Sequence, residues 1–265
     1  MKPPYPAHIE RLFTRAMINL RTTVHLGLAG VLASSLASCS QPPVMEAQPM
    51  ATPTAGANMI SDAERSAGWR LLFDGTNMDS WRGYKEATVP SGWRVEAGTI
   101  TKSKPVEDIV SKEEFSDFDL QIEWKISEAG NSGIFYRGSE EFDKIYWTAP
   151  EYQLLDDIKA SDNKTRLTCA GAAYGLYPSP TGHLNPVGEW NVTRIVARGP
   201  HVEHWLNGFK LLEYEAWSPD WEAKVKASKF AAWPKYGRLK KGHLAMQGDH
   251  TGTLAFRSIK IRELN

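Results

Sequence analysis

Hydrophobic and polar residues alternate along several short stretches of the chain. In residues 120–126 (LQIEWKI) every second residue is apolar and the residues between are polar. Strict alternation of this kind predicts a β-strand with one buried and one exposed face. The same reasoning predicts strands at 133–137, 152–155, 190–198, 201–206, 210–214, 243–247 and 253–262. Asn207-Gly208 separates two of these runs, and because both residues tolerate positive φ they predict a hairpin turn.

Many short strands separated by Gly, Pro and Asn turns predict an all-β domain, a two-sheet antiparallel sandwich of jelly-roll type. One segment differs. Ser218 is a helix N-cap candidate, Pro219 suits a first helical turn, and apolar residues follow at near-helical spacing. We therefore expect one short helix at 218–232. Because no tandem repeat is visible, the sequence speaks against a propeller or a solenoid.

The N-terminal region has the pattern of a secretory signal. An apolar run, Val24 to Ala37, follows basic residues and ends at Leu36-Ala37-Ser38-Cys39. The position of Cys39 resembles the lipobox of bacterial lipoproteins, in which the thiol is lipidated. The run is too short and too interrupted for a comfortable membrane span. A chance cysteine after an ordinary signal is the alternative, and either Met1 or Met17 could be the start.

This pattern divides the chain into three parts. Residues 1–38 are expected to be a signal peptide, and lipid on Cys39 would anchor the protein to a membrane in the periplasm or at the surface of a bacterial cell. Residues 39–66 are rich in Pro, Ala, Gln, Thr and Met without a period, which predicts a disordered tether. The folded domain is expected at 67–265.

Composition narrows the function. Lys and Arg number 31 and Asp and Glu number 31, so no basic excess is present for nucleic acid or for an anionic membrane patch. The two cysteines, Cys39 and Cys169, exclude a cysteine zinc cluster; Cys169 is unpaired if Cys39 carries lipid, and otherwise the two could form a disulfide. All ten Trp follow residue 68. Some of them are expected to be flat platforms for sugar rings and the others to fill the core.

Six sequence blocks occur in a recognisable order: 131–137 (NSGIFYR), 151–156 (EYQLLD), 188–191 (GEWN), 204–208 (HWLNG), 247–252 (QGDHTG) and 256–262 (FRSIKIR). Together they resemble the 3-keto-disaccharide hydrolase domain family over roughly residues 68–264. The resemblance implies a concanavalin/laminin-G-like jelly roll with a concave face. Two residues depart from it. Gly248 separates Gln247 from Asp249 where relatives read Gln-Asp-His, which predicts a bulge, and Ser258 stands where Asn is common.

The resemblance implies cleavage of glycosides that carry a ketone at C3. The ketone acidifies the C2 hydrogen, a base removes it, and the substituent at C1 leaves by elimination. The sequence leaves open whether water then completes a hydrolysis or the product of a lyase is released. A separate glycoside 3-dehydrogenase would have to supply the substrate, because this chain has no dinucleotide fingerprint. The alternatives are a non-catalytic carbohydrate-binding lipoprotein and a structural surface lipoprotein.

Three residues are candidates for the chemistry. His204 and His250 lie in family-like blocks, and imidazole is the natural base because histidine titrates near neutral pH. Glu123 lies on the polar face of residues 120–126 and would join them if that face lines a groove. The alternatives are histidines hydrogen-bonded at strand ends and an ordinary surface acid.

A larger group of residues is expected to contact the substrate. The fork of Arg137 suits sugar hydroxyls or a carboxylate partner. Glu151 and Gln153 share a strand face, whereas Asp156 joins them only if a bulge intervenes. Such oxygens could hold a divalent ion such as Ca²⁺ or bind sugar hydroxyls directly, so the sequence leaves a metal cofactor undecided. The complete set is Arg137, Glu151, Gln153, Asp156, Trp190, Trp205, Asn207 and Gln247.

Overall fold

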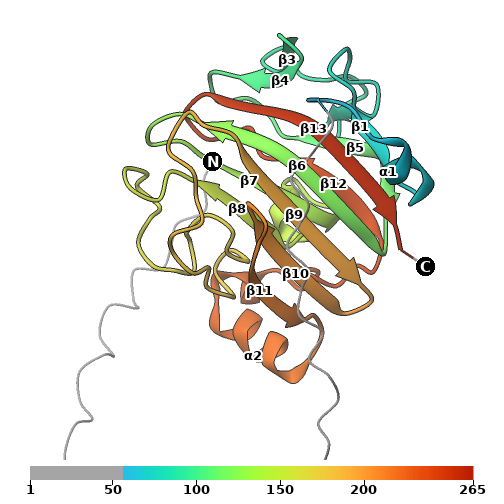
Figure 1. Ribbon diagram of the computed structural model, residues 1–265. Helices are drawn as coiled ribbons and strands as arrows, with labels where there is room; N and C mark the ends of the chain where they lie inside the picture. The colour runs from blue at the N-terminus through green and yellow to red at the C-terminus, as the bar shows by residue number, and fades with distance from the viewer. Residues whose placement is uncertain (1–55, 265) are drawn as a thin grey trace, which may run out of the picture. The chain divides into compact units, whose positions relative to one another are not determined.

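Two antiparallel β-sheets form the framework of residues 56–264, the part of the chain that the computed structural model describes (Figure 1). The eight-stranded sheet has the order β11-β10-β9-β6-β13-β4-β3, and β1 pairs with β13. Its strands are β1 Arg70–Phe73, β3 Arg94–Glu96, β4 Thr99–Lys102, β6 Phe118–Ile126, β9 Asn191–Arg198, β10 His201–Leu206, β11 Phe209–Glu215 and β13 Leu254–Glu263. The five-stranded sheet has the order β2-β5-β12-β7-β8. Its strands are β2 Trp81–Gly83, β5 Ile109–Phe115, β7 Asn131–Gly138, β8 Glu151–Leu155 and β12 Gly242–Met246.

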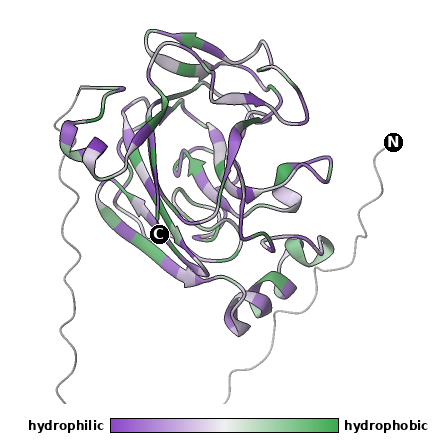
Figure 2. Ribbon diagram, turned by 90° about the vertical axis from the view of Figure 1, so that its right-hand side faces the viewer, coloured by the Kyte–Doolittle hydropathy of each residue, from purple (hydrophilic) through white to green (hydrophobic). Residues whose placement is uncertain are grey.

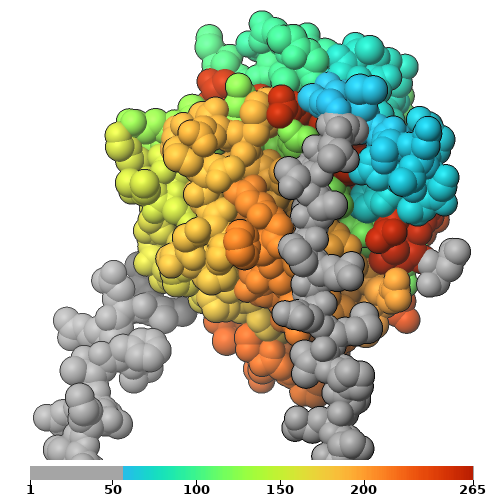
Figure 3. Space-filling view, in the orientation of Figure 1, coloured from blue at the N-terminus to red at the C-terminus, as the bar shows by residue number. Residues whose placement is uncertain are grey.

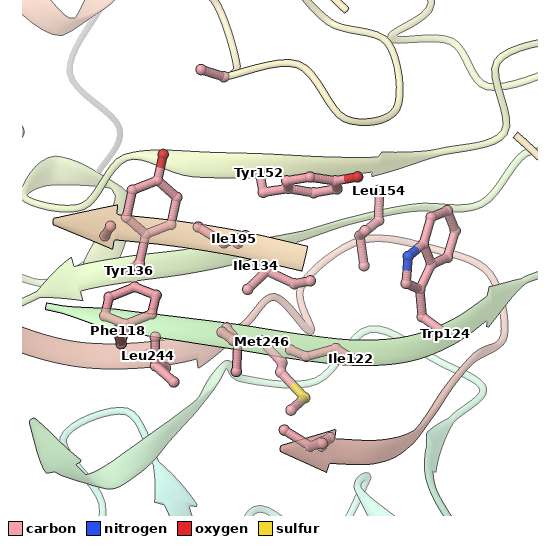
Figure 4. Close-up of a cluster of buried hydrophobic side chains, with 14 of the residues drawn as sticks. Phe118, Ile122, Trp124, Ile134, Tyr136, Tyr152, Leu154, Ile195, Leu244 and Met246 are labelled. Atoms are coloured by element: carbon pink, nitrogen blue, oxygen red, sulfur yellow. The ribbon is translucent and has the colours of Figure 1, made fainter. Parts of the chain in front are cut away.

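The core lies between the sheets. Hydrophobic and hydrophilic residues alternate along several strands (Figure 2), and the buried apolar residues of both sheets form one core cluster. Trp124 of β6, Tyr136 of β7 and Tyr152 of β8 all belong to this layer and are almost completely inaccessible (Figure 4). Trp124 Nε1 donates to Thr193 Oγ1 at 2.9 Å, so the indole is buried without an unpaired donor. The predicted all-β jelly-roll sandwich is confirmed.

The sequence predicted the long strands and missed the short ones. Every strand expected between residues 120 and 262 is present within one or two residues of its predicted bounds. Residues 70–115 supply five more strands, of which β1 to β4 have only three or four residues each. Alternation cannot be recognised over so few residues, because a single turn residue within the window hides it.

The predicted helix is shorter than expected. The α-helix α2 spans Pro219–Ala227, with Ser218 as N-cap accepting from Trp221 N, and Trp221 and Val225 face the core. Ser228 then has extended backbone angles, and the 3₁₀ helix η2, Lys229–Ala232, follows. The single helix expected over 218–232 is therefore two elements. A second 3₁₀ helix, η1, spans Ile145–Trp147.

The domain begins earlier than predicted. Residues 39–66 were expected to be a disordered tether, but the short helix α1 spans Asp62–Ser66 and has a capping box from Ser61. Asn58 also exchanges hydrogen bonds with Ser258, its N–H donating to Oγ at 2.9 Å and its Oδ1 accepting from Ser258 N at 2.8 Å. The last part of the expected tether is thus packed on the sandwich. The expected signal peptide, Cys39 and the tether up to residue 55 lie outside the described residues.

Among residues 56–264, no helix has the length and apolar character needed to cross a membrane.

Candidate active site

Polar side chains gather on the outer face of the five-stranded sheet. On β8, Tyr152 and Leu154 point into the core, so Glu151 and Gln153 point outward. Gly133 of β7 lies opposite Gln153, and Gln247 N donates to Gly133 O at 2.9 Å. Gln247, Gly133 and Gln153 therefore form one row across three neighbouring segments.

Glu151 covers the centre of this row. An ideal Cβ on Gly133 would overlap Oε1 of Glu151 and lie 2.8 Å from its Cδ, so the carboxyl group occupies the space that a side chain at residue 133 would need. The φ of Gly133 is not in the left-handed region, so backbone conformation does not demand glycine there. Glycine is required because a Cβ would collide with Glu151.

Glu151 is a buried acid with a raised pKa. Its side chain has no hydrogen-bond partner among the described residues, and the residue is only 8% exposed. Burial, followed by the negative charges of Asp108, Asp162 and Asp249, raises its pKa to about 8, although the Lys229 ammonium opposes the shift. A carboxyl group with such a pKa can donate a proton at pH 7.

Asp108, directly before β5, is a second buried acid next to the row. Its Oδ1 accepts from Gly248 N at 2.8 Å. Burial raises its pKa to about 7; the Gly248 hydrogen bond and Lys144 lower it, and the charge of Asp249 raises it. We call the group formed by Asp108, Glu151, Gln153, Gln247 and Asp249 the carboxyl–amide cluster.

Three oxygens of this cluster are buried without a hydrogen-bond donor among the described residues: Gln153 Oε1, Gln247 Oε1 and Asp249 Oδ1. Buried polar atoms are seldom left unpaired, because the loss of hydration is not compensated. Three such acceptors on one face are the natural partners of sugar hydroxyls. An all-oxygen donor set with a carboxylate also suits a hard divalent cation such as Ca²⁺ or Mg²⁺.

The loop after β12 carries Asp249 and His250. At Gly248 an ideal Cβ would lie 2.5 Å from Val106 O, so this glycine allows two backbones to approach. The register shift of β12 falls between His243 and Ala245, and none is present at Gly248, where the sequence predicted a bulge. His250 has a side chain that is 44% exposed, and its Nε2 lies 3.8 Å from Asp249 Oδ1.

His204 lies elsewhere, in the core between the sheets. It is completely inaccessible; Nε2 is 2.9 Å from Tyr136 Oη, and Nδ1 is 3.0 Å from Gly171 O. Burial lowers its pKa to about 4, against the effect of the Gly171 hydrogen bond, so the ring is neutral at pH 7. No substrate can reach this imidazole in the folded protein, and its contacts are structural.

Three further candidates lie on the outer face of the eight-stranded sheet. Glu123 accepts from Arg257 Nε at 2.7 Å, and the same guanidinium lies 4.0 Å from the ring centre of Trp190. Trp205 donates from Nε1 to Glu203 Oε2 at 2.7 Å. Residues of β9 to β11, gold and orange in Figure 3, cover much of this face. The two sheets separate these side chains from the carboxyl–amide cluster.

The remaining candidates hold loops together. Arg137 donates to Ser116 O and Gly199 O, both at 2.8 Å, and pairs with Asp117, not with Glu151 or Asp156. Asp156 accepts from three backbone N–H groups; burial would raise its pKa, but these hydrogen bonds outweigh burial and lower it. Asn207 has the positive φ predicted for the hairpin and donates to His183 O at 2.7 Å.

The 3-keto-alpha-glucoside-1,2-lyase-like domain model matches residues 68–262. The chain belongs to this family. It is 32% identical over 230 residues to a 3-keto-disaccharide hydrolase of Bacteroides thetaiotaomicron, covering 75% of this chain and 79% of the relative. A putative glycosyl hydrolase from Parabacteroides distasonis matches with a TM-score of 0.75 and 33% identity, over 79% of this chain and all of that chain. A second one from that organism matches at 0.59 and 25%, over 74% and 99%.

In this member of the 3-keto-alpha-glucoside-1,2-lyase-like family, four residues predicted from the sequence lie together. Glu151, Gln153 and Gln247 form the cluster with two acids, and His250 borders it. Asp108 was missed. Its only sequence signal is its position before the apolar pair Ile109-Val110, which shows a strand start but not a site.

Two other features of the domain resemble functional sites. His201, Glu203 and Glu213 could together ligate a metal ion, but Glu213 already pairs with Lys210 at 2.7 Å on an exposed strand edge. A cavity of about 610 Å³ lies beside α1 and β1. Its single carboxylate, Asp74, is hydrogen-bonded to Thr76, and no histidine lines the cavity.

Proposed function

We propose that the protein cleaves 3-keto-glycosides at the carboxyl–amide cluster. The observation that carries the proposal is a buried Glu151, protonated at neutral pH, among three unpaired acceptor oxygens. Family membership and the name of the 32% identical relative support a hydrolase of this substrate class.

The reaction is an elimination. A base takes the proton from C2, and the electrons of that C–H bond pass into the enolate conjugated with the C3 ketone. The enolate then expels the oxygen on C1, which takes up a proton, and a C1=C2 double bond remains. Addition of water across this bond gives net hydrolysis; release of the unsaturated sugar gives a lyase. The step needs one proton acceptor and one proton donor.

Glu151 is the proton donor in this proposal, because burial and neighbouring acids keep its proton in place at pH 7. His250 is the acceptor; it is the accessible imidazole next to the cluster, and Asp249 would stabilise it once it is charged. Gln153 and Gln247 would accept hydrogen bonds from sugar hydroxyls and orient the ring. An ordinary glycosidase would instead need a carboxylate nucleophile or base facing the acid.

The competing function is a non-catalytic sugar-binding module. A binder needs amides and aromatic rings, whereas an enzyme needs acids and bases with shifted pKa values. Asp108 and Glu151 both have strongly raised pKa values within one cluster, and Lys144 and Lys229 act on them. This concentration of titratable groups favours the enzyme.

The test compares a 3-keto-glucoside with its unoxidised parent and measures the released aglycone. We expect turnover of the oxidised compound alone. Glu151→Gln keeps the size of the side chain and removes the acid, so it should lower kcat by about 100-fold or more. Glu86→Gln, at an exposed glutamate, is the matched control. Equal release from the parent glycoside, or full activity of the Glu151 variant, would contradict the proposal.

Two proposals concern the setting of the enzyme. Lipid on Cys39 would anchor it to a membrane outside the cytoplasm; the support is the leader pattern, and a Cys39→Ala variant recovered in the soluble fraction would test it. A separate glycoside 3-dehydrogenase would supply the substrate, because a 3-keto sugar must first be made by oxidation of a hydroxyl group.

A further inference from the structure

A column of stacked aromatic rings runs through one end of the sandwich. Tyr214 of β11 lies 5.0 Å from Trp221 of α2, Trp221 lies 6.3 Å from Tyr236, and Tyr236 lies 3.9 Å from Phe230 of η2, all between ring centres. The planes are within 15° of parallel, and all four side chains are buried. Helix α2, orange in Figure 1, closes this end of the domain. The column is therefore fixed by core packing.

The column continues into rings that are only partly buried. Trp233 lies 5.7 Å from Phe230, and Trp147 of η1 lies 6.0 Å from Trp233 at an interplanar angle of 21°. Tyr146 lies 5.5 Å from Trp233. We call Tyr146, Trp147 and Trp233 the aromatic shelf. In contrast to the four inner rings, each keeps part of its surface accessible.

The shelf adjoins the carboxyl–amide cluster. Three residues separate Trp147 from Glu151, and Gly237 N donates to Thr148 O at 2.8 Å within this short link. Lys229 directly precedes Phe230, the neighbour of Trp233, and its charge acts on the Glu151 carboxyl. Burial raises the pKa of Tyr146, against the effect of the Lys144 charge, and the charges of Asp249 and Asp108 raise it further.

The two neighbouring surfaces differ in chemistry. The cluster offers acids and acceptor oxygens, which suit the hydroxyl groups and the carbonyl of the reacting sugar. The shelf consists of an indole pair and a phenol and contributes no acid or base that titrates near neutral pH. A pyranose ring or an aromatic ring binds such a surface through stacking and apolar contact. Because the column already fixes the shelf rings, little side-chain entropy is lost when a ligand stacks on them.

We infer that the aromatic shelf is the subsite for the leaving group, and that it binds a ring attached to C1: a second pyranose or a planar aromatic aglycone. The inference rests on the proposed function, because only a site that holds the reacting sugar at the cluster gives the shelf this partner. It predicts that the shelf sets substrate preference without contributing to proton transfer.

The experiment compares three 3-keto-glucosides in the full chain: a disaccharide, a phenyl glucoside and a methyl glucoside. For Trp233→Ala and Trp147→Ala we expect KM to rise about 3- to 10-fold with the ring-bearing substrates, as lost stacking implies, with kcat unchanged. KM for the methyl glucoside should not change. Trp233→Phe should restore most of the affinity. Trp190→Ala, a partly buried indole on the outer face of the other sheet, is the matched control.

An equal rise of KM for the methyl glucoside, or no rise for either ring-bearing substrate, would overturn the inference. A rise confined to the disaccharide or to the phenyl glucoside identifies which ring the shelf binds. Calorimetric titration with the unoxidised disaccharide and phenyl glucoside separates this inference from the proposed function. Weaker binding to the Trp233 variant supports the subsite even if no 3-keto compound is cleaved, and unchanged binding counts against it even if turnover is found.

Discussion

The carboxyl group of Glu151 lies over the backbone of Gly133 on the neighbouring strand, in the space that a β-carbon at residue 133 would occupy. The absence of a side chain at residue 133 is therefore a condition for the buried position of the Glu151 carboxyl group. Glycine lets the carboxyl group turn back across β7, and this position is buried enough to raise the Glu151 pKa to about 8.

Gly133→Ala tests this relationship. The new methyl group must displace the Glu151 carboxyl, so we expect a loss of about 1–3 kcal/mol in the free energy of unfolding and a large drop in kcat. Both are measurable by urea unfolding and by aglycone release. The matched background is Glu151→Ala, which empties the space. In that background the same Gly133→Ala change should cost less than 0.5 kcal/mol, and equal costs in both backgrounds would show that the two residues do not interact.

The Glu151 pKa also predicts how stability depends on pH. Because the folded pKa is raised above that of an unfolded glutamate, the folded state holds a proton that the unfolded state releases. Stability should therefore fall as pH rises from about 5 to 8, by up to about 1.4 kcal/mol per unit for this group. Glu151→Gln should flatten the profile and be more stable than the parent protein at pH 8. Thermal midpoints across this range check it, and a parallel profile for the variant would contradict the assignment.

The two histidines should separate in their effects. His204→Phe removes a hydrogen bond to Tyr136 and leaves Gly171 O unpaired, so it should cost about 1–3 kcal/mol of stability with little change in kcat of the folded protein. His250→Ala should leave stability within about 0.5 kcal/mol, since the side chain is exposed, and abolish turnover. Full turnover by the His250 variant would contradict its role as the base.

His204 has its own pH signature. Its folded pKa of about 4 lies below the unfolded value, so the unfolded state gains a proton first as pH falls. Stability should therefore decline as pH falls from about 6.5 to 4, and His204→Phe should remove part of that decline. Circular dichroism melts at these pH values measure it. Aspartates such as Asp156, whose pKa is lowered, destabilise the fold only in more acidic solution.

The unpaired oxygens suit a divalent cation as well as sugar hydroxyls. If Gln153, Gln247 and Asp249 bind one, Ca²⁺ or Mn²⁺ should raise the thermal midpoint of the parent protein by several degrees after chelator treatment. The Gln153→Leu variant should lose this response, whereas Asn207→Ala, outside the cluster, should keep it. An unchanged midpoint with millimolar cation would show that these oxygens do not bind a cation, and sugar hydroxyls would then be their expected partners.

The alternation of inward and outward side chains along a strand explains which site residues could be predicted from the sequence. Glu151 and Gln153 alternate with Tyr152 and Leu154, and this pattern alone puts the two polar residues on one exposed face. His204 alternates in phase with Val202 and Leu206, so the same rule already indicated an inward direction for it. Its place in a family-like block outweighed that signal in the sequence-based prediction.

The pairing of the strands could not be predicted from the alternation of polar and apolar residues. Gln247 meets Gly133 because β12 pairs with β7, more than 100 residues earlier in the chain. Alternation gives the face of each strand but not its neighbours. Glu123 and Trp190 were therefore combined with Glu151 although they lie on different sheets. The positive φ of Arg137 adds a local change of direction that no alternation pattern contains.

We expect Lys102 to hold in place the loop of residues 248–252, which carries Asp249 and His250. Its ammonium group is buried at the end of β4 and donates to His250 O at 2.6 Å and Gly252 O at 3.4 Å. Burial lowers its pKa, and the charges of Asp249 and Asp108 raise it. It therefore fixes the backbone that carries Asp249 and His250 without facing the substrate.

Lys102→Met should leave two carbonyl groups without their donor and lower stability by about 1–3 kcal/mol. Because the loop is then free to shift, kcat should fall while KM for the methyl glucoside changes little, and amide hydrogen exchange at residues 248–252 should become faster. Lys102→Arg, which keeps the charge, should recover part of the activity. If Lys102→Met lowers stability but leaves kcat and loop exchange unchanged, Lys102 only stabilises the fold, and the position of His250 depends on Asp249 and Gly248 alone.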